Sequence, residues 1–147
     1  MTELHEQVKA LEEKLIQYRR DFHHHPEPGW TEFRTASKII HLLRDWGYSV
    51  RYGADVVAEA AMMGVPSSEV LATKMEQALA EGADPQLLKG MAGGKTGIVA
   101  ELNCGEGPVI AIRYDMDSND IHEAKEEGHR PYREGFASKH EGAMHAC

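Results

Sequence analysis

The sequence predicts an α/β fold in which helices packed on a small mixed sheet bury one apolar core. Three observations lead to this prediction. Two N-terminal segments carry apolar residues at helical spacing, and two later segments carry the apolar runs typical of strands. The 147 residues, of which 41% are apolar and 27% charged, have the composition of a globular domain large enough to bury a core.

The first helix is predicted over residues 3–24, because apolar residues recur there at alternating steps of four and three. That spacing forms one stripe along a helix, with the following members: Leu4, Val8, Leu11, Leu15, Tyr18 and Phe22. Pro26 and Pro28 end it. A second helix over 31–46 is predicted from another one-sided set: Phe33, Ala36, Ile40 and Leu43.

Residues 52–95 are predicted to form short helices. One lies near 55–63, a second follows Ser67 and ends at Gly82, and a third begins at Asp84 and Pro85. Proline at the first helical position and glycine just past the end are the expected asymmetry of helix termini.

Two strands are predicted after this helical region. Residues 97–102 alternate weakly, whereas residues 109–114 form an almost unbroken apolar run, which is typical of a strand covered on both faces. The turn between them, NCGEGP, contains Asn, two Gly and Pro. Beyond Asp120 the chain is polar and rich in glycine, and a long loop is expected.

The charge balance disfavours several classes of partner. Sixteen Lys and Arg against 24 Asp and Glu give a formal net charge of −8, so neither nucleic acid nor an anionic membrane surface is an expected partner. No apolar run is long enough to span a bilayer, and the N-terminal residues show no apolar signal core. Two cysteines do not make a disulfide framework, so a cytoplasmic location is expected.

Two aspartates follow the second predicted strand. Asp115 and Asp117 are two residues apart, so on an extended chain both carboxylates face the same side. At the carboxyl end of a strand such a pair could ligate a metal ion or orient one of its ligands. Acidic residues also end strands in solvent without any function, and the pattern alone leaves both interpretations open.

Histidines and a cysteine offer further possible ligands. His145 and Cys147 have a spacing that suits Zn or Mn, although one such pair is a weak motif. An ordinary cysteine and a solvent-facing histidine that bind no metal explain the pair as well. The run His23, His24 and His25 is interpreted as structural, because adjacent helical residues point about 100° apart and cannot all bind one ion. The glycines of residues 90–97 lack the spacing of a phosphate-binding loop.

Four stretches together resemble the amidohydrolase branch of the two-metal aminoacylase/carboxypeptidase family. They are YRRDFHHHPEPGWTEFRTA, GGKTGIVAEL, VIAIRYDMDSND and GFASKHEGAMHAC. In that branch the stretch matching MHAC continues with Gly-His-Asp-Gly-His, so we expect the chain to be the N-terminal portion of an α/β/α catalytic domain, about a third of a family member.

The resemblance also implies a chemistry, the hydrolysis of an N-acyl amino acid amide bond by water activated between two divalent ions, Mn or Zn. Cys147 matches the metal-ligand cysteine of the branch, and Asp117 matches the acidic residue that orients a ligand. Asp115 stands where other branches carry a ligand histidine, so its role is left open. The remaining ligands and the general base are not in this sequence, and the 147-residue chain is expected to have an incomplete metal site and no activity.

The family resemblance marks residues 52–95 as a helical insert, because typical relatives pass almost directly from the segment like DWGYSV to the segment like GGKTGIVA. Such an insert is expected at the periphery of the domain. The intact protein is expected to take a small N-acyl amino acid as substrate and to form a homo- or hetero-oligomer with a second hydrolase subunit. Two alternatives are a stand-alone binding or assembly module and a small metal-buffering protein using the five His and Cys residues named above.

Overall fold

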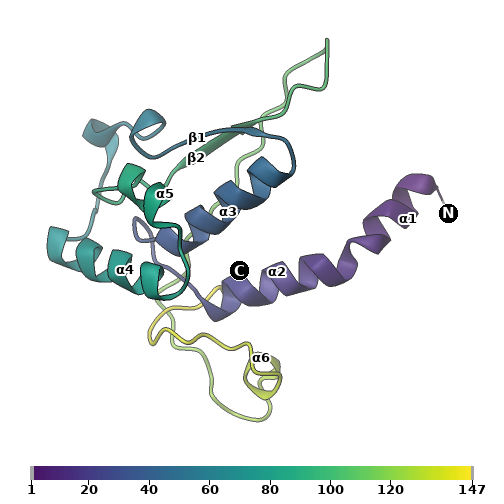
Figure 1. The fold of residues 1–147 in the computed structure, drawn as a ribbon. Helices are drawn as coiled ribbons and strands as arrows, with labels where there is room; N and C mark the ends of the chain where they lie inside the picture. The colour runs from purple at the N-terminus through teal and green to yellow at the C-terminus, as the bar shows by residue number, and fades with distance from the viewer. Residues whose placement is uncertain (1, 147) are drawn as a thin grey trace. The chain divides into compact units, whose positions relative to one another are not determined.

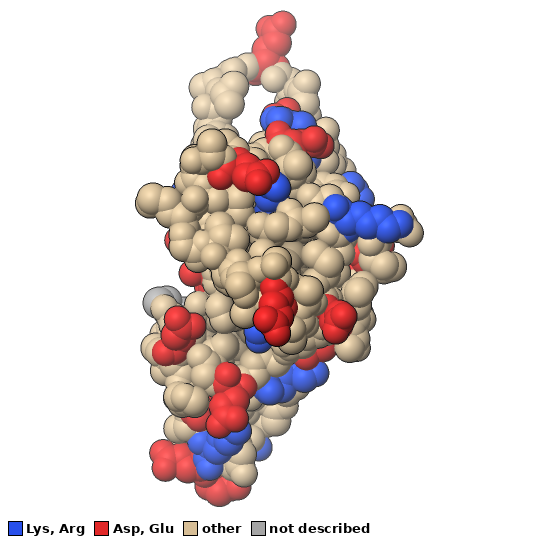
Figure 2. All heavy atoms as spheres, turned by 90° about the vertical axis from the view of Figure 1, so that its left-hand side faces the viewer, with Lys and Arg blue, Asp and Glu red and all other residues tan. Residues whose placement is uncertain are grey.

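A computed structural model describes residues 2–146, which form two compact units (Figure 1). Unit 1 combines the N-terminal residues up to Pro26 with the residues from Ser118 onward, and unit 2 is Glu27–Asp117. Within the described residues, no helix is both long enough and apolar enough to cross a membrane. Acidic and basic side chains are interspersed on the face shown in Figure 2, without a broad basic patch.

Unit 2 confirms the predicted α/β class, with helices packed on a small two-stranded sheet. Its α-helices and strands are α3 (Phe33–Asp45), β1 (Ser49–Tyr52), α4 (Ser68–Ala80), α5 (Pro85–Gly90) and β2 (Ile98–Glu101). The strands pair antiparallel, from Ser49 opposite Glu101 to Tyr52 opposite Ile98. Strand β1 was not predicted, because four residues with two polar side chains give too short a pattern.

Helix α3 lies at the centre of this unit, with the sheet on one side and α4 and α5 packed against it (Figure 1). Its residues Phe33, Ala36 and Ile40 are completely buried, as the one-sided spacing predicted. Two of the partner helices begin as predicted. The Ser67 hydroxyl accepts a hydrogen bond from the Val70 amide at 3.3 Å, and the Asp84 carboxylate accepts one from Gln86 at 2.8 Å.

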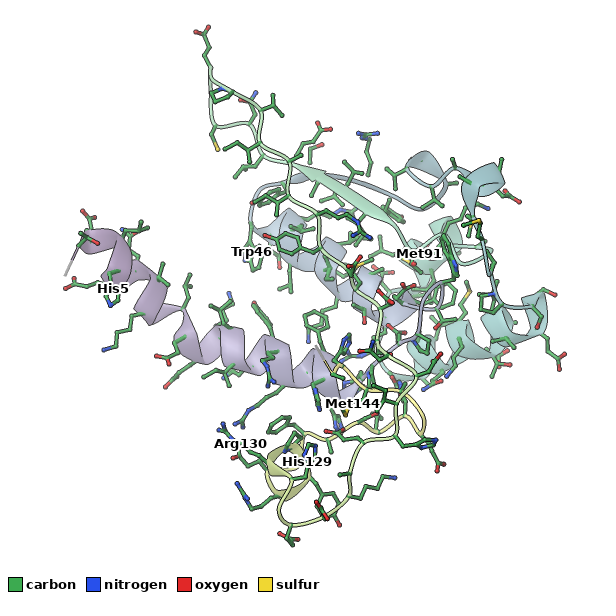
Figure 3. All side chains as sticks on the ribbon, turned by 180° about the vertical axis from the view of Figure 1, so that it is seen from behind. His5, Trp46, Met91, His129, Arg130 and Met144 are labelled. Atoms are coloured by element: carbon green, nitrogen blue, oxygen red, sulfur yellow. The ribbon has the colours of Figure 1, made fainter. Side chains whose placement is uncertain are left out.

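Residues 52–95 do not lie at the periphery of unit 2, which corrects the expectation for this insert. Six of the nine buried residues of the hydrophobic core come from it: Leu71, Ala78, Ala83, Leu87, Leu88 and Met91. Apolar residues of α4 and α5 therefore complete the core that α3 begins, and Met91 lies among them (Figure 3). The helical character of 67–90 is confirmed.

The helix predicted near 55–63 is replaced by two short 3₁₀ turns, η1 (Gly53–Asp55) and η2 (Glu59–Ala61). The chain enters this stretch at Gly53 with a positive φ of 67°, and its amide donates to the carbonyl oxygen of Gly97. A Cβ atom on Gly53 would lie 2.0 Å from the Gly90 carbonyl oxygen. The backbone of Gly53 is thus packed closely against Gly90 and Gly97, and its positive φ is not helical, so no α-helix begins there.

The prediction of a buried strand over 109–114 is wrong. These residues have no regular structure, and their apolar side chains are exposed, Val109 by 97% and Ile110 by 80%. A strand needs a neighbour for its backbone groups and a surface to cover its side chains. Within the described residues, β2 pairs with β1, and no third strand joins them.

Unit 1 contains α1 (Glu3–Ala10), α2 (Glu12–His24) and the short α6 (Arg130–Arg133). The helix predicted over 3–24 is present but is interrupted by a turn at Leu11. Its apolar stripe is largely uncovered, since Leu4, Val8 and Leu15 are each more than half exposed. Helix α6 lies in the region predicted as loop, where Pro131 occupies its first turn.

Two leucines of residues 52–95 test the role of this region in the core. We expect Leu88→Ala, at a side chain 2% exposed on α5, to lower the free energy of unfolding by about 2–5 kcal/mol, because it leaves a cavity. The matched control Leu79→Ala, at a side chain 41% exposed on α4, should change it by less than about 1 kcal/mol. Urea unfolding measures both, and equal losses would contradict a core role for this region.

Candidate functional site

The two predicted aspartates follow a segment without regular structure instead of a strand. Asp115 is exposed and forms an ion pair with Arg113, with 2.6 Å between Nη2 and Oδ1. Asp117 is exposed as well, whereas Met116 between them packs against the core of unit 2.

Asp117 lies close to a buried carboxylate that the sequence analysis did not single out. Glu32 accepts a hydrogen bond from the Thr96 hydroxyl at 2.7 Å, and both residues are buried. Burial raises the pKa of Glu32, the Thr96 bond opposes this rise, and the charges of Asp117 and Glu27 add to it. The hydrogen bond between Thr96 and Glu32 thus links the segment before β2 to the start of α3, close to Asp117.

Glu27 is the second buried carboxylate of unit 2, and it caps α3. Its Oε1 accepts from the Arg34 amide at 2.9 Å and its Oε2 from the Thr35 amide at 2.7 Å. These are N–H groups of the first helical turn, which have no partner within the helix. Burial raises the pKa of Glu27, although both backbone bonds oppose the rise. The PEPGWTE stretch thus has a structural function at α3.

In unit 1 the chain forms an isolated bridge at the two ends of a long loop. The Asn119 amide donates to the Met144 carbonyl oxygen at 3.0 Å, and the Met144 amide donates to the Asn119 carbonyl oxygen at 3.1 Å. The Asn119 side chain also accepts from the Ala146 amide at 3.4 Å. The bridge therefore fixes the backbone just before the C-terminal end of the described chain.

A buried carboxylate, Glu123, organises the loop that this bridge closes. Its Oε1 lies 2.7 Å from the Nε2 atom of His23 and 2.7 Å from the Nε2 atom of His129, and its Oε2 accepts from the Ser138 amide. The side chain of Glu123 is only 2% exposed. Burial alone would raise its pKa, but the bonds from His23, Ser138 and His129 outweigh burial and lower the pKa.

The three adjacent histidines bind separate partners, as their helical geometry predicted. His23 contacts Glu123, the Nδ1 atom of His24 lies 2.6 Å from the Ala137 carbonyl oxygen, and the Nδ1 atom of His25 lies 2.9 Å from the Asp21 carbonyl oxygen. Their structural interpretation is supported by these contacts. Glu123 and His129 were not singled out from the sequence, because their stretch lacks periodicity. The other partners of Glu123 are His23, 100 residues away, and the backbone amide of Ser138.

The described residues do not fit a metal centre by themselves. Among residues 2–146, no group of three or more His, Cys, Asp and Glu side chains could hold a metal ion. His145 is partly buried, the proposed ligand Cys147 lies outside the described residues, and the other cysteine, Cys104, is free and exposed. A site built on Asp115, Asp117 and Cys147 is therefore not assembled by the part of the chain that the structure describes.

Comparisons with known proteins relate the whole chain to hydrolases. It is 47% identical over 148 residues to the A subunit of p-aminobenzoyl-glutamate hydrolase from Escherichia coli (strain K12), a match that covers 100% of this chain and 34% of that protein. It is 45% identical to indole-3-acetyl-aspartic acid hydrolase of Enterobacter agglomerans, over 98% of this chain and 33% of that protein. The chain is a homologue of these hydrolases.

A solved structure supports this relationship. The crystal structure of an aminobenzoyl-glutamate utilization protein from Klebsiella pneumoniae matches with a TM-score of 0.78 and 43% identity, covering 81% of this chain and 30% of that one. The chain thus spans about a third of the length of the relatives it matches. No protein-family model matches it.

The matches confirm a narrower prediction from the sequence. The long region 52–95 and the stretch HRPYREGFAS indicate a resemblance to the A subunit of p-aminobenzoyl-glutamate hydrolase within the amidohydrolase branch. The relative of that name aligns with the whole of this chain, including both features.

The two buried carboxylates of unit 2 should respond oppositely to loss of charge. Glu27→Gln should lower the free energy of unfolding by about 1–3 kcal/mol, since an amide has one acceptor oxygen for two backbone donors. Glu32→Gln should be neutral or stabilising at pH 7, because the Gln carbonyl can keep the Thr96 bond without a buried charge.

The sign of the pH dependence follows from the raised pKa of Glu32. A carboxyl group whose pKa is raised on folding destabilises the folded state at neutral pH, and this effect fades as the pH falls through the raised value. The advantage of Glu32→Gln over the unmodified chain should therefore shrink between pH 7 and pH 4. Urea unfolding at the two values measures it, and a growing advantage toward acid would contradict the assignment.

Proposed function

We propose that this chain is the N-terminal third of a metal-dependent amide hydrolase that cleaves p-aminobenzoyl-glutamate to p-aminobenzoate and glutamate. The alignment of the whole chain with one subunit of the E. coli p-aminobenzoyl-glutamate hydrolase carries the proposal. A second relative is named for indole-3-acetyl-aspartic acid, which also joins an aromatic acyl group to an acidic amino acid. The proposed substrates are therefore N-acyl amino acids with an aromatic acyl group and a second carboxylate.

The proposed contribution of this chain to catalysis is limited to a few residues. Cys147 is the one proposed metal ligand, and its thiolate would bind Mn or Zn. Asp117 is proposed to orient a ligand, and the neighbouring Met116 packs against the core of unit 2. Asp115 has no assigned part, because its carboxylate is engaged by Arg113. The other ligands and the base are assigned to sequence outside this chain.

The proposed assembly follows the names of the relatives. The E. coli relative is named as one subunit of a hydrolase, which implies a second subunit, so the intact hydrolase is proposed to act as a homo- or hetero-oligomer. Cytoplasmic location, and a role in the use of p-aminobenzoyl-glutamate as a product of folate breakdown, are parts of the same proposal.

The 147-residue chain by itself should not hydrolyse p-aminobenzoyl-glutamate. Hydrolysis at a metal ion needs several fixed ligands and a base within reach of the water, and Cys147 is one ligand without these partners. We expect no release of p-aminobenzoate above background from the purified chain with excess Mn. Turnover that disappears in the Cys147→Ala variant would contradict this expectation.

A chimera tests the function directly. Replacing the matched third of the E. coli relative with this chain should give a hydrolase of p-aminobenzoyl-glutamate, measured as release of p-aminobenzoate in the presence of the second subunit. Cys147→Ala in the chimera should reduce turnover by at least about 100-fold, because a metal ligand is lost.

The control for the chimera is Cys104→Ala, which changes an exposed cysteine with no proposed role and should leave turnover unchanged. A folded chimera that cleaves indole-3-acetyl-aspartate but not p-aminobenzoyl-glutamate would overturn the substrate. A folded chimera that keeps full activity after Cys147→Ala would overturn the assigned ligand.

A further inference from the structure

Glu123 has a role that the resemblance to hydrolases does not assign. Its buried carboxylate collects three donors from distant parts of unit 1: His23 at the end of α2, His129 just before α6, and the backbone amide of Ser138. A buried carboxylate without partners would be strongly unfavourable, and three donors to one group give it a single defined environment.

Residues next to Ser138 also form hydrogen bonds with the end of α2 and the residues just after it. The His24 ring contacts the Ala137 carbonyl oxygen at 2.6 Å, and the Lys139 amide donates to the His24 carbonyl oxygen at 3.1 Å. The Nδ1 atom of His140 lies 2.6 Å from the Pro26 carbonyl oxygen. Residues 137–140 have no helix or strand of their own, so these bonds set their course.

A second set of contacts surrounds His23, the partner of Glu123 on α2. Arg20 pairs with Glu134 at 2.5 Å and lies 4.5 Å from the centre of the Phe136 ring. The ring of Phe136 in turn meets the His23 ring edge-on, with 5.8 Å between centroids. Phe136 thus packs on His23, one of the partners of the Glu123 carboxylate, whose own burial strengthens its hydrogen bonds. Figure 3 labels His129 and Arg130 at α6, together with Met144 in the same unit.

We propose that Glu123 is a positioning residue that holds residues 138–146 on the end of α2 and so presents the chain that leads into Cys147. The segment is held by the Ser138 amide on Glu123, by the bonds of Lys139 and His140 to the end of α2, and by the bridge between Met144 and Asn119. Removing the Glu123 carboxylate takes away the bond that begins this series, and the remaining bonds near α2 lose the fixed position of Ser138. The part concerning Cys147 rests on the proposed function, whereas the part concerning 138–146 does not.

The number of donors explains why a carboxylate is needed at this position. Two imidazole Nε2 atoms and one amide all donate to Glu123, which requires that both His23 and His129 carry a proton on Nε2. A Gln side chain has one acceptor oxygen, and its NH₂ group would face a donor. Glu123→Gln should therefore keep the shape of the side chain and lose the positioning.

The first experiment uses the ¹⁵N-labelled 147-residue chain at neutral pH. In Glu123→Gln, amide hydrogen exchange at Ser138 and Met144 should accelerate at least about tenfold, while exchange in β2 stays unchanged. The Gln oxygen can keep the bonds from His23 and His129 only when its NH₂ group faces the Ser138 amide. The imidazole ¹⁵N shifts of both histidines should therefore stay at the values of the Nε2–H tautomer while exchange at Ser138 accelerates, a combination that general loosening of the loop would not produce.

Matched variants make the result specific. Glu126→Gln removes an exposed carboxylate three residues away and should behave as the unmodified chain. His129→Asn removes one of the three donors, so it should accelerate exchange by less than Glu123→Gln and leave His23 in its tautomer. Exchange in Glu123→Gln equal to that of Glu126→Gln would overturn the proposal.

The second experiment tests presentation of Cys147 in the chimera with the E. coli relative. Loss of bound Mn to a chelator should be at least about tenfold faster with Glu123→Gln than with Glu126→Gln. Equal rates, with accelerated exchange in the chain, would overturn the link to Cys147. If Cys147→Ala does not change metal loss, the proposed function fails, and the exchange experiment alone decides the role of Glu123.

Discussion

The burial of one face of α3 is the constraint on which unit 2 depends. Phe33, Ala36 and Ile40 are fully covered, and each such side chain contributes about 1.5–3 kcal/mol when it leaves water, alanine less. The helix can sit in that core only if its first-turn N–H groups find partners there. The buried Glu27 carboxylate accepts hydrogen bonds from two of these N–H groups, so burial of the apolar face of α3 depends on this cap.

Much of unit 2 could be predicted because its signals are local. Apolar spacing predicted α3, Ser67 and the Asp84-Pro85 pair predicted the starts of α4 and α5, and the alternation of 97–102 predicted β2. Local signals do not say what covers an apolar face. The same kind of pattern therefore predicted burial for 109–114, which is exposed, and a stripe on α1 and α2, which is largely uncovered.

The polar contacts of the candidate site were harder to predict, because most of them join residues far apart in the sequence. The separate roles of His23, His24 and His25 followed from helical geometry alone and are consistent with their contacts. Glu123 could not be found in this way, since its partner His23 is 100 residues away in sequence and its Ser138 bond involves a backbone amide. Glu32 likewise acquires its character from Thr96, 64 residues further along. Polar networks of this kind depend on tertiary contacts that no spacing encodes.

The uncovered segment 109–114 also bears on how the chain behaves in solution. It combines four large apolar or aromatic residues, Val109, Ile110, Ile112 and Tyr114, without proline or glycine, and a single charge at Arg113. Short segments of this composition stack as identical strands between molecules, with backbone groups pairing from copy to copy. The segment therefore has the composition that favours such stacking, and Arg113 is the one charged residue within it.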